Sequence, residues 1–338
     1  MSVPSPRRHR PSDADDGTPV EVSVVIAARD AERTLPHQLR ALAAQRPACA
    51  WEVVVADNGS TDGTRAVAEA ARSWLPGLRT VDASAVRGAG AARNAGVEAA
   101  RGGLVLFCDA DDVVAPGWVD ALRTALRRTE LVGGRLEWRR LNGPTALASR
   151  ALPQDDGLQH GDPLPDLPCA SSSNLGISRA LFRRIGGFDP AARFLQDTDL
   201  CWRAQLAGAS IGFAPDAVVH MRLRTGLRGA WGQGRSSGMG QRWLAARYGP
   251  LAAERAAAAG ARGPGDAAGP GRGAGRSWPS RIVRRAGLVG GEVLRVRTPG
   301  DAARLAWSTG FGVGYAVGGL PEPEPYRLAH APGVAELA

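Results

Sequence analysis

The segment DADD, Asp109–Asp112, carries the residues best suited to chemistry in this sequence. It follows the apolar run LVLF and is expected at a strand end. Alternate residues of an extended chain point to the same side, so Asp109 and Asp111 can present both carboxylates to one hard cation. Mg²⁺ or Mn²⁺ held by two carboxylates keeps coordination positions open for a diphosphate. A solvated acidic turn is the alternative interpretation.

A second strand end and a glycine-rich helix start supply groups suited to a nucleotide. DNGSTDGT begins with Asp57, which can accept a hydrogen bond from a base N–H or a ribose hydroxyl. Ser60 or Thr61 in the same turn can equally cap a helix. GAGAARNAG, residues 88–96, lets the backbone approach a ligand closely, with Arg93 near the phosphates. It is a poor dinucleotide fingerprint, and tight helix–sheet packing is the alternative.

Two carboxylates in QDTDLCWR are candidates for a general base. Asp197 and Asp199 lie at an expected helix N-terminus, where the helix dipole stabilises negative charge. Either can act as the base, or both can merely cap the helix, which is the interpretation favoured for Asp199. His220 ends a later strand and can complete the metal site through one imidazole nitrogen.

The elements that position these residues alternate between strand and helix. Buried strands are expected at VEVSVVIAA, WEVVVAD, RTVDAS and GGLVLFCDADD, with helices at about 34–45 and 62–72 and a Gly/Ala-rich helix after RTVDAS. This order predicts an α/β fold with a mostly parallel, Rossmann-like central sheet flanked by helices. Ligands of such sheets lie outside the C-terminal strand ends, where Asp57 and DADD fall.

The chain is expected to divide into four parts. Residues 1–19 form a disordered tail, and residues 20–247 form the catalytic domain, with a nucleotide-binding half at 20–112 and an acceptor half at 113–247. The acceptor half includes a long loop at 141–168, a candidate lid. Residues 248–280 are a helix and a Gly/Pro-rich linker. Residues 281–338 are a small C-terminal helical extension.

Two C-terminal features bear on the acceptor. A flexible basic loop is expected after His220, with Arg222, Arg224, Arg228 and Arg235 around the Gly-rich WGQGRSSGMG. It can close on a diphosphate, meet an anionic acceptor or remain solvated. Residues 305–320 are uncharged, and their G-x-x-x-G spacing favours packing against the catalytic domain over an interfacial or re-entrant membrane element.

Composition narrows the function classes. The 338-residue chain has a formal charge of +9 and no Lys, which excludes a Lys-dependent phosphate loop and a Schiff-base mechanism. The basic residues are spread along the chain, so no nucleic-acid partner is expected. Cys49, Cys108, Cys169 and Cys201 include no C-x-x-C pair and are expected to be buried free thiols. Since no apolar run follows the N-terminal charges, a cytoplasmic location is expected, including the inner face of a membrane.

In this order the motifs resemble the family 2 glycosyltransferases with the GT-A fold, from about Val20 to His220 and more loosely to Arg247. VSVVIAARD is similar to the opening strand, with Ala27 and Asp30 in place of the usual Pro and Asn. ADNGSTDGT resembles the nucleoside-binding turn, and RGAGAARNAGVEAARGGLVLFCDADD the central block. SNLGISRALFRRIGGFD resembles the acceptor-side segment, and QDTDLCWR the catalytic motif, with Gln196 where Glu is common.

The resemblance implies a metal-dependent, inverting transfer of a sugar from a UDP-, GDP- or dTDP-sugar to an acceptor hydroxyl. It implies Asp197 as the base; Ala28, Asp30, Asp57, Arg93 and Asp109 as nucleotide contacts; Asp109, Asp111 and His220 as ligands of Mn²⁺ or Mg²⁺; and Asn174, Asp199, Trp202 and Arg203 as acceptor-positioning residues. Cell-envelope polysaccharide, glycolipid or related glycoconjugate synthesis is the implied setting, with peripheral membrane contact if the acceptor is lipid-linked.

Three other functions remain as alternatives. A sugar-phosphate nucleotidyltransferase normally needs a Gly-rich basic signature after the first strand, where this chain has RDAERTL. A non-catalytic nucleotide-sugar-binding protein is disfavoured by the intact Asp109, Asp111 and Asp197. An NAD(P)-dependent enzyme needs a glycine fingerprint after Ala28 that the sequence lacks.

Overall fold

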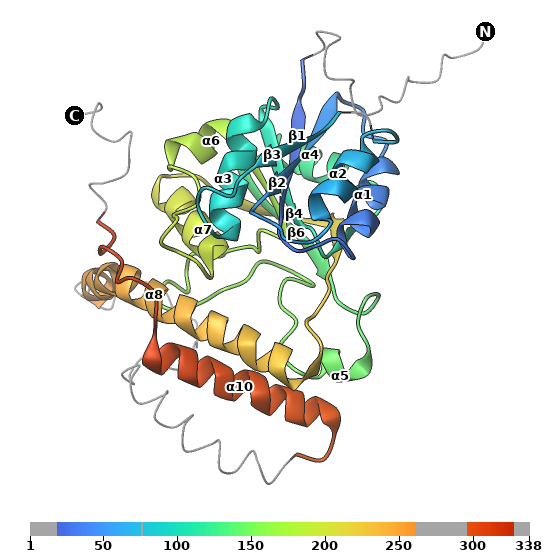
Figure 1. Ribbon diagram of the computed structural model, residues 1–338. Helices are drawn as coiled ribbons and strands as arrows, with labels where there is room; N and C mark the ends of the chain where they lie inside the picture. Colours follow the sequence, from blue (N-terminus) through green and yellow to red (C-terminus); the bar gives the residue numbers. More distant parts are fainter. Residues whose placement is uncertain (1–18, 76, 261–295, 328–338) are drawn as a thin grey trace, which may run out of the picture.

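Four parallel strands form one half of the central sheet in the computed structural model, which describes residues 19–75, 77–260 and 296–327 (Figure 1). Their order is β3-β2-β1-β4. The strands are β1 (Val22–Ala28), β2 (Trp51–Asp57), β3 (Leu78–Asp82) and β4 (Leu104–Asp109). β2 is buried along its whole length, as its β-branched run requires when helices cover both faces of a sheet. The predicted parallel α/β core is confirmed.

The other half of the sheet is mixed. β7 (Asn174–Ser178) pairs antiparallel to β4, and β6 (Leu131–Glu137) pairs antiparallel to β7. β8 (Ile211–His220) runs parallel to β6, and the short β5 (Val113–Val114) closes this edge. The antiparallel β7 inserted beside β4 marks the change from the first half of the domain to the second.

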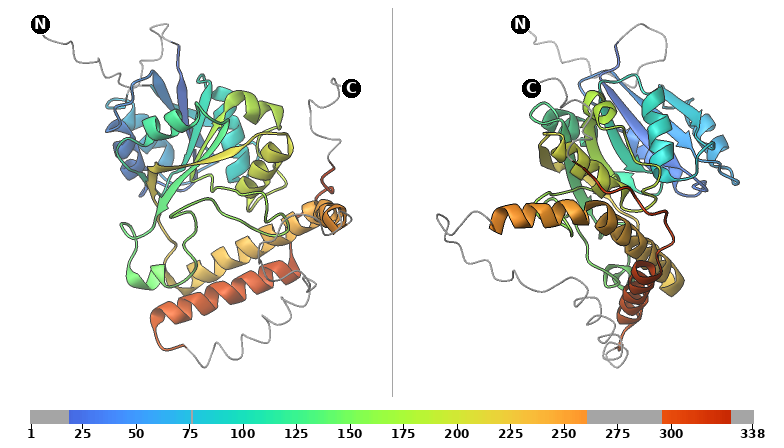
Figure 2. Two further views of the ribbon diagram at one scale, coloured as in Figure 1. Left: turned by 180° about the vertical axis from the view of Figure 1, so that it is seen from behind. Right: turned by 90° about the vertical axis from the view of Figure 1, so that its left-hand side faces the viewer.

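Helices cover both faces of the sheet (Figures 1 and 2). On one face, α1 (Leu35–Ala43), α2 (Thr64–Ala71) and α4 (Trp118–Ala125) share an apolar cluster with β1, β2 and β4. On the other face, α3 (Ala89–Ala99), α6 (Arg179–Arg184) and α7 (Gln196–Leu206) share a cluster that includes Phe107, Phe182 and Phe188. All four cysteines are unpaired and buried, as predicted.

A two-helix layer lies below the sheet domain (Figure 1). α8 (Gly226–Gly260) is one long helix, and α10 (Pro299–Val317) lies alongside it in both views of Figure 2. α8 bends toward its C-terminal end, where Pro250 interrupts the hydrogen-bond ladder. The short α5 (Pro144–Leu147) is the helical turn within the 141–168 segment.

Small residues bring α8 and α10 into backbone contact. A Cβ added at Gly310 would meet the carbonyl oxygen of Trp231, and one at Gly314 would meet that of Arg235. The same is true in reverse, because a Cβ at Gly234 would meet the backbone of Trp307. The predicted close packing at Gly310 and Gly314 is therefore confirmed, with α8 as the neighbour; Gly318 instead ends α10 at a φ of 70°.

One sequence prediction about this region is wrong. The Gly-rich WGQGRSSGMG segment is helical rather than a flexible loop, and Gly234, Gly238 and Gly240 are positions at which α8 approaches other backbone. Residue 247, at which the catalytic domain is predicted to end, lies inside α8. The predicted tail, linker and extreme C-terminus lie largely outside the described residues.

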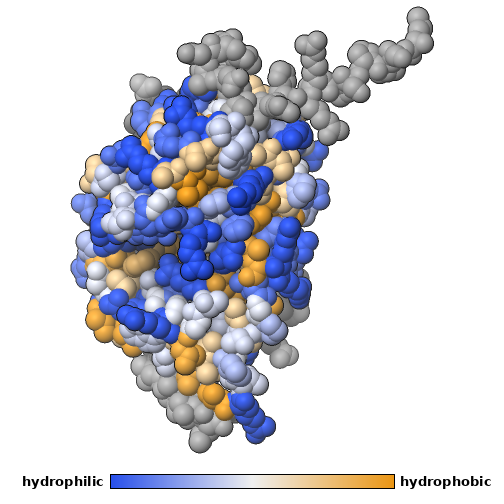
Figure 3. Space-filling model, turned by 45° about the vertical axis from the view of Figure 1, so that its right-hand side comes forward, coloured by the Kyte–Doolittle hydropathy of each residue, from blue (hydrophilic) through white to orange (hydrophobic). Residues whose placement is uncertain are grey.

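The surface is largely polar. On the face seen in Figure 3, hydrophilic residues (blue) crowd the middle of the molecule, and hydrophobic ones (orange) are scattered between them. Among residues 19–75, 77–260 and 296–327, no helix combines the length and the apolar composition needed to cross a membrane.

Candidate active site

The C-terminal ends of β1, β2 and β4 meet at one edge of the sheet. Ala28 lies opposite Asp57 in the register of β1 and β2, and Ala27 lies opposite Asp109 in that of β1 and β4. A cleft of about 570 Å³ opens there. Its walls include Ala28, Arg93, Asp109, Asp197 and the glycine-rich start of α3. The position is the one expected for a ligand in a parallel α/β sheet.

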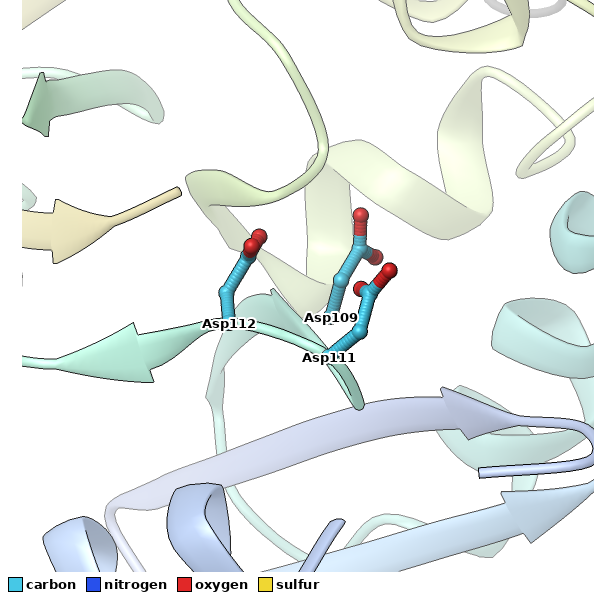
Figure 4. A group of neighbouring side chains, drawn as sticks. All are labelled: Asp109, Asp111 and Asp112. Atoms are coloured by element: carbon cyan, nitrogen blue, oxygen red, sulfur yellow. The ribbon is translucent and has the colours of Figure 1, made fainter. Parts of the chain in front are cut away.

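The three aspartates of DADD converge next to this cleft (Figure 4). Asp109, Asp111 and Asp112 each offer a carboxylate oxygen within 4.8 Å of the others. The carboxylates do not come together by alternation along a strand, as was predicted. β4 ends at Asp109, and residues 110–112 form a turn rather than extended chain. The turn adds Asp112, which is buried, to the expected pair.

Crowding makes the cluster electrostatically unusual. Asp111 is exposed to solvent on one side, yet partial desolvation by the surrounding protein, and then the neighbouring Asp109, raise its pKa to about 6. Burial, and then Asp111 and Asp109, raise the pKa of Asp112 well above its usual range. One oxygen of Asp112, Oδ2, is buried with no hydrogen-bond partner among the described residues. A divalent cation would offset the repulsion between these carboxylates and give the unpartnered oxygen a partner. Oxygen ligands are those that Mg²⁺ and Mn²⁺ prefer. The donor set therefore fits such an ion.

Arg93 joins the glycine-rich helix to this cluster. Its Nη2 donates to Asp109 Oδ1 at 2.5 Å, and the guanidinium lies 5.6 Å from the ring centre of Phe188. Its Nε and Nη1 atoms are buried without hydrogen-bond partners in the described structure. The other oxygen of Asp109 accepts from Ser173 Oγ at 2.9 Å. Arg93 thus holds the first aspartate in place and brings unpaired donors to the cleft wall.

Asp197 stands at the start of α7, facing the acidic cluster. It lines the 570 Å³ cleft and also a second hollow of about 310 Å³ whose walls include Asp109, Asp111 and Asp112. Its Oδ2 accepts from the Ser172 N–H at 3.1 Å. Leu195, two residues earlier, has a left-handed φ of 53°, a costly backbone conformation of the kind found at functional sites.

Gln196 ties α7 to the glycine-rich helix. Its Oε1 accepts from the Gly90 N–H at 3.1 Å, and a Cβ at Gly90 would lie 2.9 Å from that oxygen. Gln196, which stands where Glu is common in the family motif, therefore links the start of α3 to the start of α7. Its neutral amide does so without adding charge beside Asp197.

The residues predicted to contact the nucleoside form hydrogen bonds within and around the turn that follows β2. Asp57 is buried, and its Oδ1 accepts from the Ser60 hydroxyl at 2.5 Å, which is the turn role considered for this segment. Asp30 has a φ of 48° and accepts from the Thr61 N–H at 2.8 Å. Asn58, next to Asp57, is the residue of this turn that lines the cleft.

His220, whose role as a metal ligand stays a prediction, contacts two side chains in the described structure. Its Nδ1 lies 2.7 Å from Glu137 Oε2 and its Nε2 lies 2.9 Å from Arg140 Nη1. Both ring nitrogens are thus engaged, and the acidic cluster assembles without the imidazole. The strand end was predicted correctly, but the pairing of β8 with β6 places His220 beside Glu137.

The four residues predicted to position the acceptor, Asn174, Asp199, Trp202 and Arg203, are all buried. Asn174 is fully buried and satisfied, donating to the Arg135 and Ala217 carbonyls and accepting from the Trp118 indole at 2.8 Å. Sequence patterns alone cannot separate such a buried amide from one that faces a ligand.

The other three belong to a buried network behind α7. Asp199 is paired with Arg203 at 2.7 Å and accepts from the Tyr248 hydroxyl at 2.7 Å. Trp202 is fully buried and donates to the Leu167 carbonyl. Their helical spacing from Asp197 turns them toward the core and α8, in agreement with the structural interpretation of Asp199.

Sequence reasoning missed several residues that line the site. They are Asp112, Ser172, Ser173, Asn58 and the α8 residues Gln233, Ser236 and Ser237. Asp112 could have been found as the last residue of DADD. The α8 residues lie in the WGQGRSSGMG segment, which was predicted to reach a diphosphate as a loop, but no pattern indicated which of its side chains would line the cleft.

Comparison with known proteins agrees with this geometry. Residues 23–186 match the family model described as Glycosyl transferase family 2. The matched part of the chain belongs to this family, and the sheet with its flanking helices is of the GT-A type. A mannosyltransferase from Pyrobaculum calidifontis, solved with GDP-Man and Mn²⁺, superposes with a TM-score of 0.55 at 19% identity, over 93% of this chain and 89% of that one.

Two curated relatives are similar in sequence. Glycosyltransferase AglE of Haloferax volcanii is 29% identical over 58% of this chain and 65% of its own length. Succinoglycan biosynthesis protein ExoO of Rhizobium meliloti is 29% identical over 61% of this chain and 62% of its own. The chain therefore spans slightly less than two thirds of each relative's length.

Proposed function

We propose that this protein is an inverting glycosyltransferase that moves a sugar from a nucleotide-diphosphate sugar to an acceptor hydroxyl. One observation carries the proposal: Asp197 and Asp109 line both the 570 Å³ cleft and the 310 Å³ hollow. A base and a cation-binding cluster thus face the same space, on the side of the sheet where nucleotides bind.

The chain's own groups suit the two halves of the reaction. The Asp197 carboxylate takes the proton of the acceptor hydroxyl as that oxygen forms its bond to the anomeric carbon. The bond between that carbon and the diphosphate breaks on the opposite face, and this gives inversion. The Ser172 N–H, at 3.1 Å, orients the Asp197 carboxylate for this role.

The leaving group needs positive charge. Asp111 and Asp109, with the unpartnered oxygen of Asp112, would hold Mn²⁺ or Mg²⁺, which as a Lewis acid stabilises charge on the departing diphosphate. The two unpaired nitrogens of Arg93 are further donors on the cleft wall.

The donor and acceptor classes follow the family. A UDP-, GDP- or dTDP-sugar is the proposed donor, and a cell-surface polysaccharide or glycolipid precursor the proposed acceptor. The succinoglycan role in the name of ExoO supports a polysaccharide setting, and peripheral contact with the inner face of a membrane would suit a lipid-linked acceptor.

The experiment is a panel of nucleotide sugars with and without Mn²⁺, read by thermal shift and by nucleotide release. Asp197→Asn should keep donor binding and lower release by about 10²–10⁴-fold, because it removes only the base. Asp166→Asn, at an exposed position outside the cleft, is the matched control. The proposal fails if no nucleotide sugar shifts the melting temperature, or if Asp197→Asn turns over at the wild-type rate.

A further inference from the structure

A separate hollow lies beside the cleft, where α5, the start of α8 and the start of α10 meet. Its volume is about 510 Å³, within the roughly 300–1,000 Å³ typical of small-molecule sites. Its walls are mainly apolar and include Pro144, Ala146, Leu227, Ala230 and Ala303. Leu227 at its edge keeps 54% of its surface exposed, so its side chain is available to an apolar ligand.

Arg224 lies between this hollow and the proposed catalytic cleft. The residue lines the apolar hollow and also the two spaces lined by Asp197. It is exposed, and it precedes α8 by two residues. A ligand with its apolar part in the hollow would therefore place its polar end at Arg224, next to the catalytic space.

A second arginine stands close by without a counter-ion. Arg150 donates from Nε to Ser149 Oγ at 3.2 Å and from Nη1 to Gln233 Oε1, while its Nη2 is buried with no partner in the described structure. Burial, and then the charge of Arg224, lower the pKa of Arg150. Among residues 19–75, 77–260 and 296–327, neither Arg150 nor Arg224 forms a salt bridge with a carboxylate. The charge of Arg224 also acts on Asp111, whose pKa it lowers, but Arg150 adds a second positive charge beside it. Two neighbouring cations of this kind favour an anion supplied by a ligand.

We propose that this hollow, with Arg224 on its wall and Arg150 close to Arg224, is the acceptor site for an amphiphile that carries a phosphate group. The apolar chain lies between α5, α8 and α10, and the phosphate lies at Arg224. The inference rests on the proposed function in calling the ligand an acceptor. Binding of the amphiphile in the hollow does not itself depend on sugar transfer. It also gives α10 a role, because Pro299, Ala302 and Ala303 supply one wall.

The test measures binding without any donor, by isothermal titration calorimetry. Decyl phosphate, below its micellar concentration, should bind at least about tenfold more tightly than inorganic phosphate or 1-decanol, because each of these retains only half of the interaction. Arg224→Gln should weaken decyl phosphate binding by about tenfold or more. Arg228→Gln, also exposed and basic but outside the hollow, should leave it within about a factor of two.

The apolar half has its own variants. Ala302→Phe on the wall of α10 should fill the hollow and abolish decyl phosphate binding, whereas Ala316→Phe, exposed on the same helix, should not. Leu227→Asp, at an exposed position that tolerates the change, should also weaken binding by repelling the phosphate and removing apolar wall.

The outcomes separate the phosphate sources. If Arg224→Gln weakens binding of UDP or GDP but not of decyl phosphate, the arginines serve the donor's diphosphate and the proposal is overturned. Equal binding of inorganic and decyl phosphate, or unchanged binding in both Ala302→Phe and Leu227→Asp, also overturns it. These binding measurements contain no nucleotide sugar, so their failure would not contradict the proposed glycosyltransferase activity. Conversely, a panel of nucleotide sugars that shows no activity would not contradict the proposed amphiphile site.

Discussion

The contact between α8 and α10 yields a prediction whose sign depends on the tertiary structure. Gly312 and Gly314 are two residues apart in α10, and both are interior helical positions. A Cβ at Gly312 meets nothing within 4 Å, whereas a Cβ at Gly314 would collide with the backbone carbonyl of Arg235 in α8. Replacing each by Ala makes the same chemical change in two different environments.

Helix propensity favours Ala over Gly at both positions, but a steric cost opposes it only at Gly314. Ala is favoured over Gly in a helix interior by roughly 0.8–1.0 kcal/mol, so Gly312→Ala should raise the free energy of unfolding by up to about that amount. At Gly314 the same gain meets an overpacking cost of about 1–3 kcal/mol, because a backbone carbonyl cannot rotate away as a side chain could. Gly314→Ala should therefore be less stable than Gly312→Ala by about 1–3 kcal/mol.

Urea unfolding of the two variants and the wild type gives this difference from the midpoints at constant slope. Hydrogen exchange of the α10 amides tests the local effect, since Gly314→Ala should speed exchange in α10 while β2 stays protected. If Gly314→Ala matches or exceeds Gly312→Ala in stability, the two helices do not cross at these glycines. The wall that α10 gives to the apolar hollow would then be wrong as well.

Three other predictions concern polar groups in the core and in the acidic cluster. Tyr248→Phe removes the hydroxyl that donates to the buried Asp199, and it should lower the free energy of unfolding in urea by about 1–3 kcal/mol. Burial opposes ionisation of Glu52, yet its hydrogen bonds and ion pairs outweigh this and lower its pKa; Glu52→Gln should therefore destabilise the protein near neutral pH, and the difference from wild type in urea should shrink as the pH falls below the ordinary value of 4.5. Because the pKa of Asp111 is raised to about 6, Mn²⁺ affinity measured by calorimetry at constant ionic strength should fall as the pH drops through that value, by about tenfold per unit below it; a flat profile would exclude Asp111 as a ligand.

Local patterns predicted what depends on neighbours along the chain. The β-branched runs identified β1, β2 and β4, and the carboxylates that follow them were placed correctly at the strand ends. The carboxylates of the DADD segment were predicted to come together, but the turn that follows β4 rather than strand alternation gathers them. The sequence pattern was sufficient there, since the three residues lie within four positions of the chain.

Residues whose role depends on distant partners were not predictable in this way. Asn174 and Asp199 fit a functional motif, yet each is buried among groups from other elements that satisfy its hydrogen bonds. His220 was placed at a strand end, but its neighbour Glu137 comes from a strand 83 residues away along the chain. Periodicity reports which face of an element is apolar, and it does not report which polar side chain meets which partner.

The sequence by itself determined the parallel α/β core, the strand-end carboxylates and the family of this protein, because these depend on periodicity and on short motifs. Only the tertiary structure decided that α8 lies against α10 at its glycines, that α8 lines the cleft, and that Arg224 lines both the cleft and an apolar hollow. The physical reason is that glycine and arginine carry little positional information in a sequence. A glycine-rich segment is typical of a loop, and only the structure shows that another backbone lies against it; an arginine is typical of solvated surface, and only the structure shows which cavities it lines.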